Sequence, residues 1–248
     1  MKHDAVKRLV PAASTAVLFV HGILGTPRYF DGFVARIPET YSVHNLLLAG
    51  HGGTVADFGR ASMAQWRQQV REALIELRGS HRRVLVVAHS LGTLLTLQAL
   101  IDEPGLADAL FLLAVPLRIF PKPRTALTNI LVGLGATKPA SPAIRAAQEA
   151  YGTDSDWRVW RYIPWIPRYL ELFAQSAAIR RMLPRLTVPT QAYMSARDDL
   201  VSMRSCKALQ KAACVTVTVL PESGHYHYAA KDRALLLERF TQMMDEQS

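Results

Sequence analysis

A serine that follows a strand and opens a helix is a candidate nucleophile. Residues 88–92 read Ala-His-Ser-Leu-Gly, directly after an apolar run (83–88) and before a segment of helical composition. A nucleophile on such a sharp turn needs very small residues two positions before and after it, because neighbouring backbone passes close by; Ala88 and Gly92 meet that need. The N–H groups that open the helix would stabilise negative charge. Ser90 is therefore a candidate nucleophile, and an ordinary helix N-cap is the alternative.

Two aspartates follow a late apolar run and are candidates for orienting a catalytic base. The run 190–196 has β composition, and Asp198 and Asp199 come shortly after it. Open α/β sheets carry functional side chains at this end of their strands. The alternative is a solvated turn that precedes a helix N-cap near Ser202. The residue types alone do not choose between the two carboxylates.

A histidine after the last apolar run supplies the base that a serine nucleophile needs. Residues 221–225 read Pro-Glu-Ser-Gly-His, and we expect Gly224 to let the loop turn so that His225 points back toward Ser90. His227 lacks an adjoining glycine and is the weaker candidate. Three further histidines are expected to bond backbone at glycine-rich turns or to point away from the serine: His21, His51 and His89.

A glycine-containing turn follows the first apolar run, 15–20, and reads His-Gly-Ile-Leu-Gly at 21–25. If this run and the run 83–88 form neighbouring strands, the backbone N–H groups of Ile23 and Leu91 would converge on one oxygen atom. Each such donor contributes about 3 kcal/mol to the stabilisation of a developing oxyanion. A tight turn with no further role is the alternative.

Six short apolar or β-branched runs predict strands, and amphipathic segments separate most of them. Such alternation requires right-handed crossovers between parallel strands and places helices on both faces of the sheet. A helix should begin after Ser62 and run to about Gly79, and the last helix contains Leu236, Phe240 and Met243. The fold class is therefore α/β, with about six mainly parallel strands. The six runs are 15–20, 41–48, 83–88, 107–115, 190–196 and 215–220.

The alternation stops in the segment 117–185, which is rich in proline and contains no convincing strand. We expect a helical cap inserted here, because a structureless loop of this length is improbable in a compact domain, and 143–151 and 169–183 have helical composition. The α/β core would then comprise residues 1–116 and 186–248. Three tryptophans of the cap either bind substrate in an apolar acyl pocket or pack the cap on the core: Trp157, Trp160 and Trp165.

Composition limits the remaining classes of protein. About half of the 248 residues are apolar and about a fifth are charged, which is enough for one domain with a sizeable core. No apolar run reaches the roughly 18 residues that span a bilayer, and the signal-like N-terminus is needed as a strand, so we expect a cytoplasmic protein. Metal-ligand and nucleotide-phosphate motifs are absent from the sequence, so no cofactor is expected. Cys206 and Cys214 are expected to be free thiols in the core.

The segment 117–185 also carries most of the positive charge. It holds 11 Lys and Arg against 4 Asp and Glu, which is +7 of the net +9. Such a surface could steer anionic substrates or make transient contact with a membrane surface, although a solvated arginine surface is the commoner case. No motif that reads nucleic acid accompanies it, so nucleic acid is not an expected partner. The sequence leaves the oligomeric state open.

Four motifs, in this chain order, resemble those of the α/β-hydrolase superfamily: His-Gly after the first run, Ala-His-Ser-Leu-Gly, Asp-Asp-Leu-Val and Ser-Gly-His. Residues 21–25 and the turn Ala-Gly-His-Gly-Gly at 49–53 look most like bacterial carboxylesterases and monoacylglycerol lipases. Ala88 replaces the first glycine of the family's G-x-S-x-G. The resemblance favours Asp198 as the acid, since the family's acid stands three residues before a valine that packs into the core, here Val201.

The resemblance implies acyl transfer through an acyl-enzyme intermediate on a small ester with an apolar acyl chain. Ser90 would be the nucleophile, His225 the base, and the N–H groups of Ile23 and Leu91 the oxyanion donors. It also implies a sheet without the two antiparallel N-terminal strands of larger members. A thioesterase, a serine peptidase and a non-catalytic ligand-binding relative are the alternatives.

Overall fold

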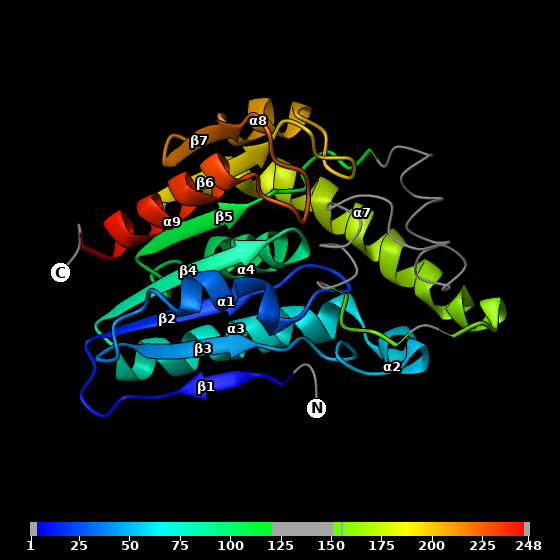
Figure 1. Ribbon diagram of the computed structural model, residues 1–248, viewed down its shortest axis with the longest axis horizontal. Helices are drawn as coiled ribbons and strands as arrows, with labels where there is room; N and C mark the ends of the chain where they lie inside the picture. The colour runs from blue at the N-terminus through cyan, green and yellow to red at the C-terminus, as the bar shows by residue number, and fades with distance from the viewer. Residues whose placement is uncertain (1–3, 121–150, 155, 246–248) are drawn as a thin grey trace.

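The computed structural model describes residues 4–120, 151–154 and 156–245, and these contain a seven-stranded sheet with helices on both faces (Figure 1). The strand order is β1-β3-β2-β4-β5-β6-β7, and every neighbouring pair is parallel except β1 with β3. The expected α/β class with a mainly parallel sheet is confirmed. The strands are β1 (Val6–Arg8), β2 (Thr15–Val20), β3 (Ser42–Leu46), β4 (Arg83–His89), β5 (Ala109–Leu113), β6 (Thr190–Ser195) and β7 (Val215–Leu220).

Each of the six predicted runs contains one strand, and the seventh strand, β1, was not predicted. Val6, Lys7 and Arg8 are all exposed and pair antiparallel with residues 43–45 of β3. The expectation that the sheet lacks both antiparallel N-terminal strands is therefore wrong, because one short antiparallel strand is present. The physical reason is that β1 forms by edge pairing and buries no side chain, so it leaves no apolar pattern in the sequence.

The central strands supply both halves of the core. In β2, the side chains of Ala16, Leu18 and Val20 join one apolar cluster, and those of Val17 and Phe19 join the other. Helices α3, α4 and α8 cover the first face, whereas α1 and α9 cover the second (Figure 1). The α-helices are α1 (Asp31–Val34), α2 (Val55–Arg60), α3 (Met63–Ser80), α4 (Leu91–Asp102), α7 (Ile166–Met182), α8 (Arg204–Leu209) and α9 (Ala230–Asp245). The short 3-10 helices are η1 (Pro27–Phe30), η2 (Val159–Trp165) and η3 (Leu183–Arg185).

The two best-marked helices lie where the sequence predicts them. Helix α3 begins after Ser62, whose hydroxyl accepts a hydrogen bond from the Gln65 N–H at 3.2 Å. The three apolar residues that mark the last helix are buried in α9. The buried guanidinium of Arg83 donates to the carbonyl oxygens of Met243 and Met244 at 2.7 and 2.9 Å. These bonds connect the first residue of β4 to the C-terminal end of α9.

Helix α7 accounts for one of the two helices expected in the cap segment, residues 117–185. The expected helix 169–183 overlaps α7 almost completely. The other expected helix, 143–151, lies outside the described residues except for its last residue. Within the described part of the cap segment, η2 and η3 flank α7. The division of the chain into core and cap stays a proposal.

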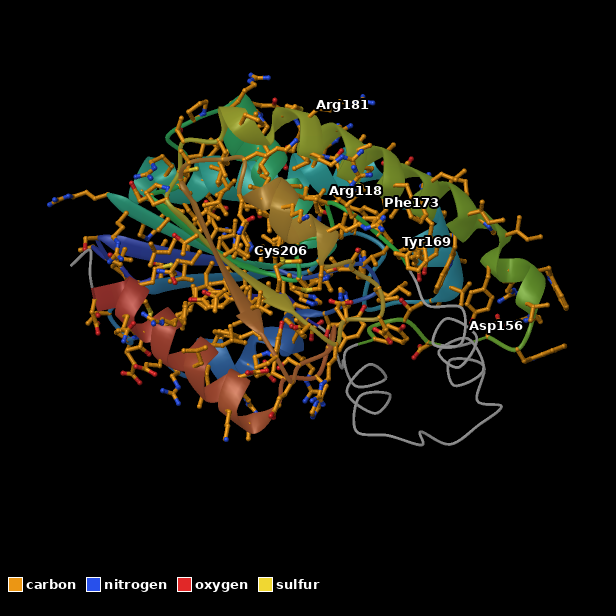
Figure 2. The ribbon with its side chains drawn as sticks, turned by 90° about the horizontal axis from the view of Figure 1, so that it is seen from above. Arg118, Asp156, Tyr169, Phe173, Arg181 and Cys206 are labelled. Carbon is orange, nitrogen blue, oxygen red and sulfur yellow. The ribbon has the colours of Figure 1, made fainter. Side chains whose placement is uncertain are left out.

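One face of α7 packs on the core, along the edge of the molecule seen in Figure 2. Leu172 and Ile179 are buried there, and the Gln175 side-chain N–H donates to Gln98 of α4 at 3.0 Å. The Ser176 hydroxyl, also buried on this face, donates to the carbonyl of residue 116 at 2.6 Å. This side of α7 is therefore fixed to the core by apolar packing and by hydrogen bonds.

The three tryptophans of the cap segment have different environments. Trp165 is 9% exposed, its indole N–H donates to the Val55 carbonyl at 2.8 Å, and its ring centre lies 4.6 Å from that of Phe58. Trp157 and Trp160 are 76% and 57% exposed, and their ring centres are 5.9 Å apart. The expected roles were binding of substrate and packing of the cap on the core, and the contacts of Trp165 are those of packing.

Two buried histidines hold the glycine-rich turns at the carboxyl ends of β2 and β3. His21 donates from Nδ1 to the Gly22 carbonyl at 2.8 Å and accepts the Leu48 N–H at Nε2 at 3.1 Å. His51 donates from Nδ1 to the Ala49 carbonyl at 3.2 Å. Burial lowers the pKa of His51 to about 4 and holds the pKa of His21 well below its usual range. The expectation that both bond backbone at turns is confirmed.

We expect Trp165→Ala to lower the free energy of unfolding by about 3 kcal/mol or more, because it removes a buried ring and leaves a buried carbonyl without its donor. The matched control, Trp160→Ala, should change it by less than about 0.5 kcal/mol, since that ring is exposed. Urea unfolding of both variants makes the measurement. Equal losses would show that the exposed ring also stabilises the fold.

The free energy of unfolding should fall as the pH drops below about 6.5, the ordinary pKa of histidine in an unfolded chain. In this range the unfolded chain binds protons at His21 and His51 that the folded protein does not bind. Each of the two histidines therefore lowers the free energy of unfolding by up to about 1.4 kcal/mol per pH unit. Urea unfolding at about pH 7.5 and about pH 5.5 measures the slope. His51→Gln should reduce the slope of the free energy of unfolding against pH by the contribution of one histidine. An unchanged slope would mean that His51 is protonated as readily in the folded protein as in the unfolded chain.

Candidate active site

Ser90 lies on a strained turn between β4 and α4. Its φ of 50° and ψ of −121° are unusual for a residue with a side chain. The Ser90 N–H donates to the Leu113 carbonyl on β5 at 3.0 Å, and the Thr93 hydroxyl and N–H both donate to the Ser90 carbonyl, at 2.7 and 2.9 Å. The predicted order of strand, serine turn and helix is confirmed, and hydrogen bonds on both sides hold the turn.

Small residues around the serine allow the backbone to approach closely. A Cβ on Gly92 would lie 2.1 Å from the Val20 carbonyl oxygen, so no side chain fits there. A Cβ on Gly22 would lie 2.9 Å from the Cβ of the serine itself. Ala88, which replaces a glycine of the family's pattern, is fully buried in β4 within an apolar cluster. The turn therefore accommodates its methyl group.

Ser90, His225 and Asp198 form one hydrogen-bonded chain. The Ser90 hydroxyl oxygen is 3.1 Å from His225 Nε2, and His225 Nδ1 is 2.8 Å from Asp198 Oδ2. All three residues are buried and follow the carboxyl ends of β4, β7 and β6. The fold thus brings together the three side chains that the sequence singled out.

Asp198, and not its neighbour Asp199, contacts the histidine. Its other oxygen, Oδ1, accepts the N–H groups of Leu200 and Val201 at 2.8 Å each. Burial acts to raise the pKa of the Asp198 carboxyl, but the nearby His225 and these hydrogen bonds outweigh it and hold the pKa below its usual value. The side chain of Asp199 makes no hydrogen bond within the described residues.

A buried carboxylate on α9 fixes the loop that carries His225. Asp232 accepts the Glu222 N–H at 3.0 Å and the Ser223 hydroxyl at 2.6 Å, and that hydroxyl in turn accepts the Ala229 N–H at 3.2 Å. These bonds tie both ends of the loop to the first turn of the helix. The sequence analysis missed this residue, because an acid in the first turn of a helix is common for electrostatic reasons alone.

The turn at Gly224 differs from the expectation. Its backbone is not left-handed, and a Cβ there would meet no atom closer than 3.8 Å. The turn is closed instead by the Gly224 N–H, which donates to the His227 carbonyl at 2.9 Å. Glycine is therefore not required at this position. In the described part of the chain, the imidazole of His227 has no hydrogen bond and does not compete with His225.

His89, next to Ser90 in the chain, contacts the backbone of His225. Its Nε2 donates to the His225 carbonyl at 3.0 Å, so its ring is directed at the backbone of the base and not at the serine hydroxyl. The Tyr29 ring lies 4.2 Å from the His89 ring, and its hydroxyl donates to that of Tyr228 at 2.7 Å. Burial holds the pKa of His89 well below its usual range, so the ring stays neutral.

The Ile23 N–H lies on the turn after β2, and the Leu91 N–H follows Ser90 on the turn after β4. The strands that precede these turns, β2 and β4, are parallel neighbours, as predicted. Leu24, next to Ile23, has a left-handed φ of 58°, which makes the first turn tight. Leu91 is the first residue of α4, where an N–H has no acceptor within the helix. Among the described residues, no acceptor is found for the Ile23 N–H.

Residues 151 and 152, near the middle of the cap segment, reach the same site. The Tyr151 ring centre is 5.9 Å from that of Tyr226, which itself lies perpendicular to the His225 ring at 4.7 Å. Gly152 donates its N–H to the Leu24 carbonyl at 2.9 Å. Burial raises the pKa of Tyr151 to about 12 and that of Tyr226 well above its usual range, so both phenols stay neutral. No motif in the sequence points to these two tyrosines.

The structure describes residues 4–120, 151–154 and 156–245. This part of the chain contains no group of three or more His, Cys, Asp or Glu side chains placed to hold a metal ion. It also contains no helix of the length and apolarity needed to cross a bilayer. Cys206 and Cys214 are free thiols, as expected, but both are half-buried and do not lie in the core.

The family and the fold are seen in comparisons with known proteins. The model of the alpha/beta hydrolase family matches residues 17–237. A structure of the metagenome-derived lipolytic enzymes LipS and LipT is 20% identical with a TM-score of 0.75, covering 99% of this chain and 98% of that one. A monoacylglycerol lipase of Paleococcus ferrophilus is 14% identical with a TM-score of 0.69, covering 98% and 99%.

A structure from work on carboxylesterases of the thaumarchaeon Nitrososphaera gargenis is 15% identical with a TM-score of 0.63, covering 98% of this chain and 92% of that one. No curated protein sequence matches this chain. At these identities the structural likeness establishes the fold alone, whereas the family match spans most of the sequence. The chain therefore belongs to the alpha/beta hydrolase family.

Proposed function

We propose that the protein is a serine hydrolase that cleaves carboxylic esters, of the carboxylesterase or monoacylglycerol lipase type, through an acyl-enzyme intermediate. The observation that carries the proposal is the hydrogen-bonded chain from Ser90 through His225 to Asp198, with distances of 3.1 and 2.8 Å. A hydroxyl that donates to a neutral imidazole held by an ionised carboxylate is an effective nucleophile toward acyl groups. The structural relatives described as lipolytic enzymes, carboxylesterases and a monoacylglycerol lipase favour esters as the substrate class.

In the first step, Ser90 Oγ attacks the ester carbonyl carbon while His225 Nε2 accepts the hydroxyl proton. Asp198 keeps the Nδ1 proton in place and stabilises the imidazolium that forms. The N–H groups of Ile23 and Leu91 stabilise the tetrahedral oxyanion by about 3 kcal/mol each. The carbon–oxygen bond to the alcohol then breaks, and the alcohol leaves with the proton from His225. Water, deprotonated by the same imidazole, hydrolyses the acyl-enzyme.

Replacing the nucleophile tests this mechanism. Ser90→Ala should lower turnover by about 10⁶ while the protein remains folded, because it removes the proposed nucleophile. Turnover is measured on a matched set of carboxylic esters, acyl thioesters and aminoacyl amides, and the wild-type protein should favour the esters. A fluorophosphonate should label the peptide that contains Ser90 and fail to label the variant. Retained turnover would overturn the serine mechanism, whereas a preference for thioesters would overturn only the substrate class.

Two neighbouring carboxylates allow a matched test of the acid. Asp198→Asn should lower turnover by about 10⁴, because the amide cannot hold the required imidazole tautomer. The control, Asp199→Asn, removes the same charge at the neighbouring residue. It should alter turnover by less than about threefold, since the His225 imidazole is hydrogen-bonded to Asp198 and not to Asp199. Steady-state kinetics on one ester compare the two. The reverse ranking would assign the role to Asp199.

A further inference from the structure

Exposed apolar side chains form a row along η2 and α7. A 3-10 helix has three residues per turn, so residues three apart share a face. Trp160 and Ile163 have this spacing within η2, and the same spacing includes Trp157, before η2, and Ile166, the first residue of α7. Leu170 continues the row one turn into α7. Their exposed fractions lie between 56% and 76%. We call these five residues the outer stripe.

The outer stripe is distinct from the surface that packs on the core. The buried side of η2 and α7 is formed by Trp165, Leu172, Gln175 and Ile179. Among the described residues, 12 large apolar side chains are exposed, and 7 of them lie between positions 157 and 173. Such clustering differs from the scattered exposure that is usual on a soluble surface and indicates an interaction site.

Positive charge lies beside the first residues of the stripe. The Asp156 carboxylate lies between two guanidiniums, at 2.9 Å from Arg158 and 2.8 Å from Arg161, so this cluster keeps one positive charge in excess. The Arg158 guanidinium carbon is 5.9 Å from the ring centre of Trp157. A cation and an exposed aromatic ring are therefore side by side at this end of the outer stripe.

More positive charge lies at the other end of α7. The helical positions of the stripe continue from Leu170 through two alanines, 174 and 177, to the exposed Arg181, which Figure 2 shows far from Asp156 along the helix. Burial lowers the pKa of Arg180, and the nearby positive charges of Arg118 and Arg181 lower it further. No carboxylate pairs with these three guanidiniums in the described part of the chain.

We propose that the outer stripe is a docking surface for a bilayer that contains anionic phospholipid. Tryptophan and aliphatic side chains on one face of a helical segment enter the interfacial region of a bilayer, and arginines at its borders attract lipid phosphate. Residues 156–185 hold six Arg against one Asp and one Glu, which complements an anionic surface. The same charge opposes pairing of the stripe with that of a second copy. This inference does not depend on the proposed catalytic mechanism.

Co-sedimentation with vesicles tests the docking surface. Ether-linked phosphatidylcholine, with or without ether-linked phosphatidylglycerol, gives a surface that an ester hydrolase cannot digest. We expect binding to the anionic vesicles, weaker binding to phosphatidylcholine alone and weaker binding at high salt. Tryptophan fluorescence should shift to shorter wavelength on binding, since Trp157 and Trp160 enter the interface. Ser90→Ala should bind as the wild-type protein does.

A matched pair of variants assigns the binding to the stripe. Ile163→Glu combined with Leu170→Glu should weaken binding to anionic vesicles by about tenfold or more, because two apolar side chains are lost and two negative charges are added. The control, Ile75→Glu, changes an exposed isoleucine of α3 and should stay within about twofold. Hydrolysis of a short soluble ester should be unchanged in all of them, since none of these residues contacts the triad.

Three results would overturn the proposal. The first is that the wild-type protein fails to bind anionic vesicles at low salt. The second is that the Ile75→Glu control loses as much binding as the stripe variant does. The third is a dimer of the wild-type protein, seen by light scattering, that the stripe variant converts to a monomer while neither protein binds vesicles. That outcome would make the outer stripe a contact between copies.

Discussion

The close approach of α4 to the end of β2 is the constraint on which the candidate site depends. A Cβ at Gly92 would be 2.1 Å from the Val20 carbonyl oxygen, so the helix can begin at this place only if residue 92 lacks a side chain. The chain turns sharply just before this contact, at Ser90, whose φ of 50° is held by bonds to β5 and to Thr93. It also places the N–H of Leu91 beside the first glycine-rich turn.

Around this turn, the buried charge of Asp198 is stabilised at both oxygens. One oxygen faces His225, and the other accepts two backbone N–H groups, so removal from water is compensated and the carboxyl stays ionised. The base is supported separately, through Asp232 on its own loop and through His89 on its carbonyl. The imidazole is therefore held from several sides, which is what proton transfer between fixed groups requires.

Helix α7 has a side that packs on the core and a side that is exposed. The inner side holds the cap segment on the core through buried apolar residues and hydrogen bonds to Gln98 and to the residue 116 carbonyl. The outer stripe makes no such contact. Near the site, Tyr151 packs on Tyr226, the neighbour of His225, and Gly152 bonds to the first turn, so the same segment also contacts the site. The cap segment thus joins an exposed apolar surface to the surroundings of the proposed triad.

The sequence by itself determined six of the seven strands, the serine turn and the order of Ser90, an aspartate and His225, because these depend on local periodicity and on residue size. The residue types left Asp198 and Asp199 open, and the family resemblance favoured Asp198. The tertiary structure decided that Asp198 faces the histidine, since adjacent side chains point in different directions and their partner comes from another strand end. Strand β1 and the hydrogen bonds of Asp232 were also seen only in the tertiary structure. They depend on contacts between residues far apart in the chain, which leave no periodic pattern in the sequence.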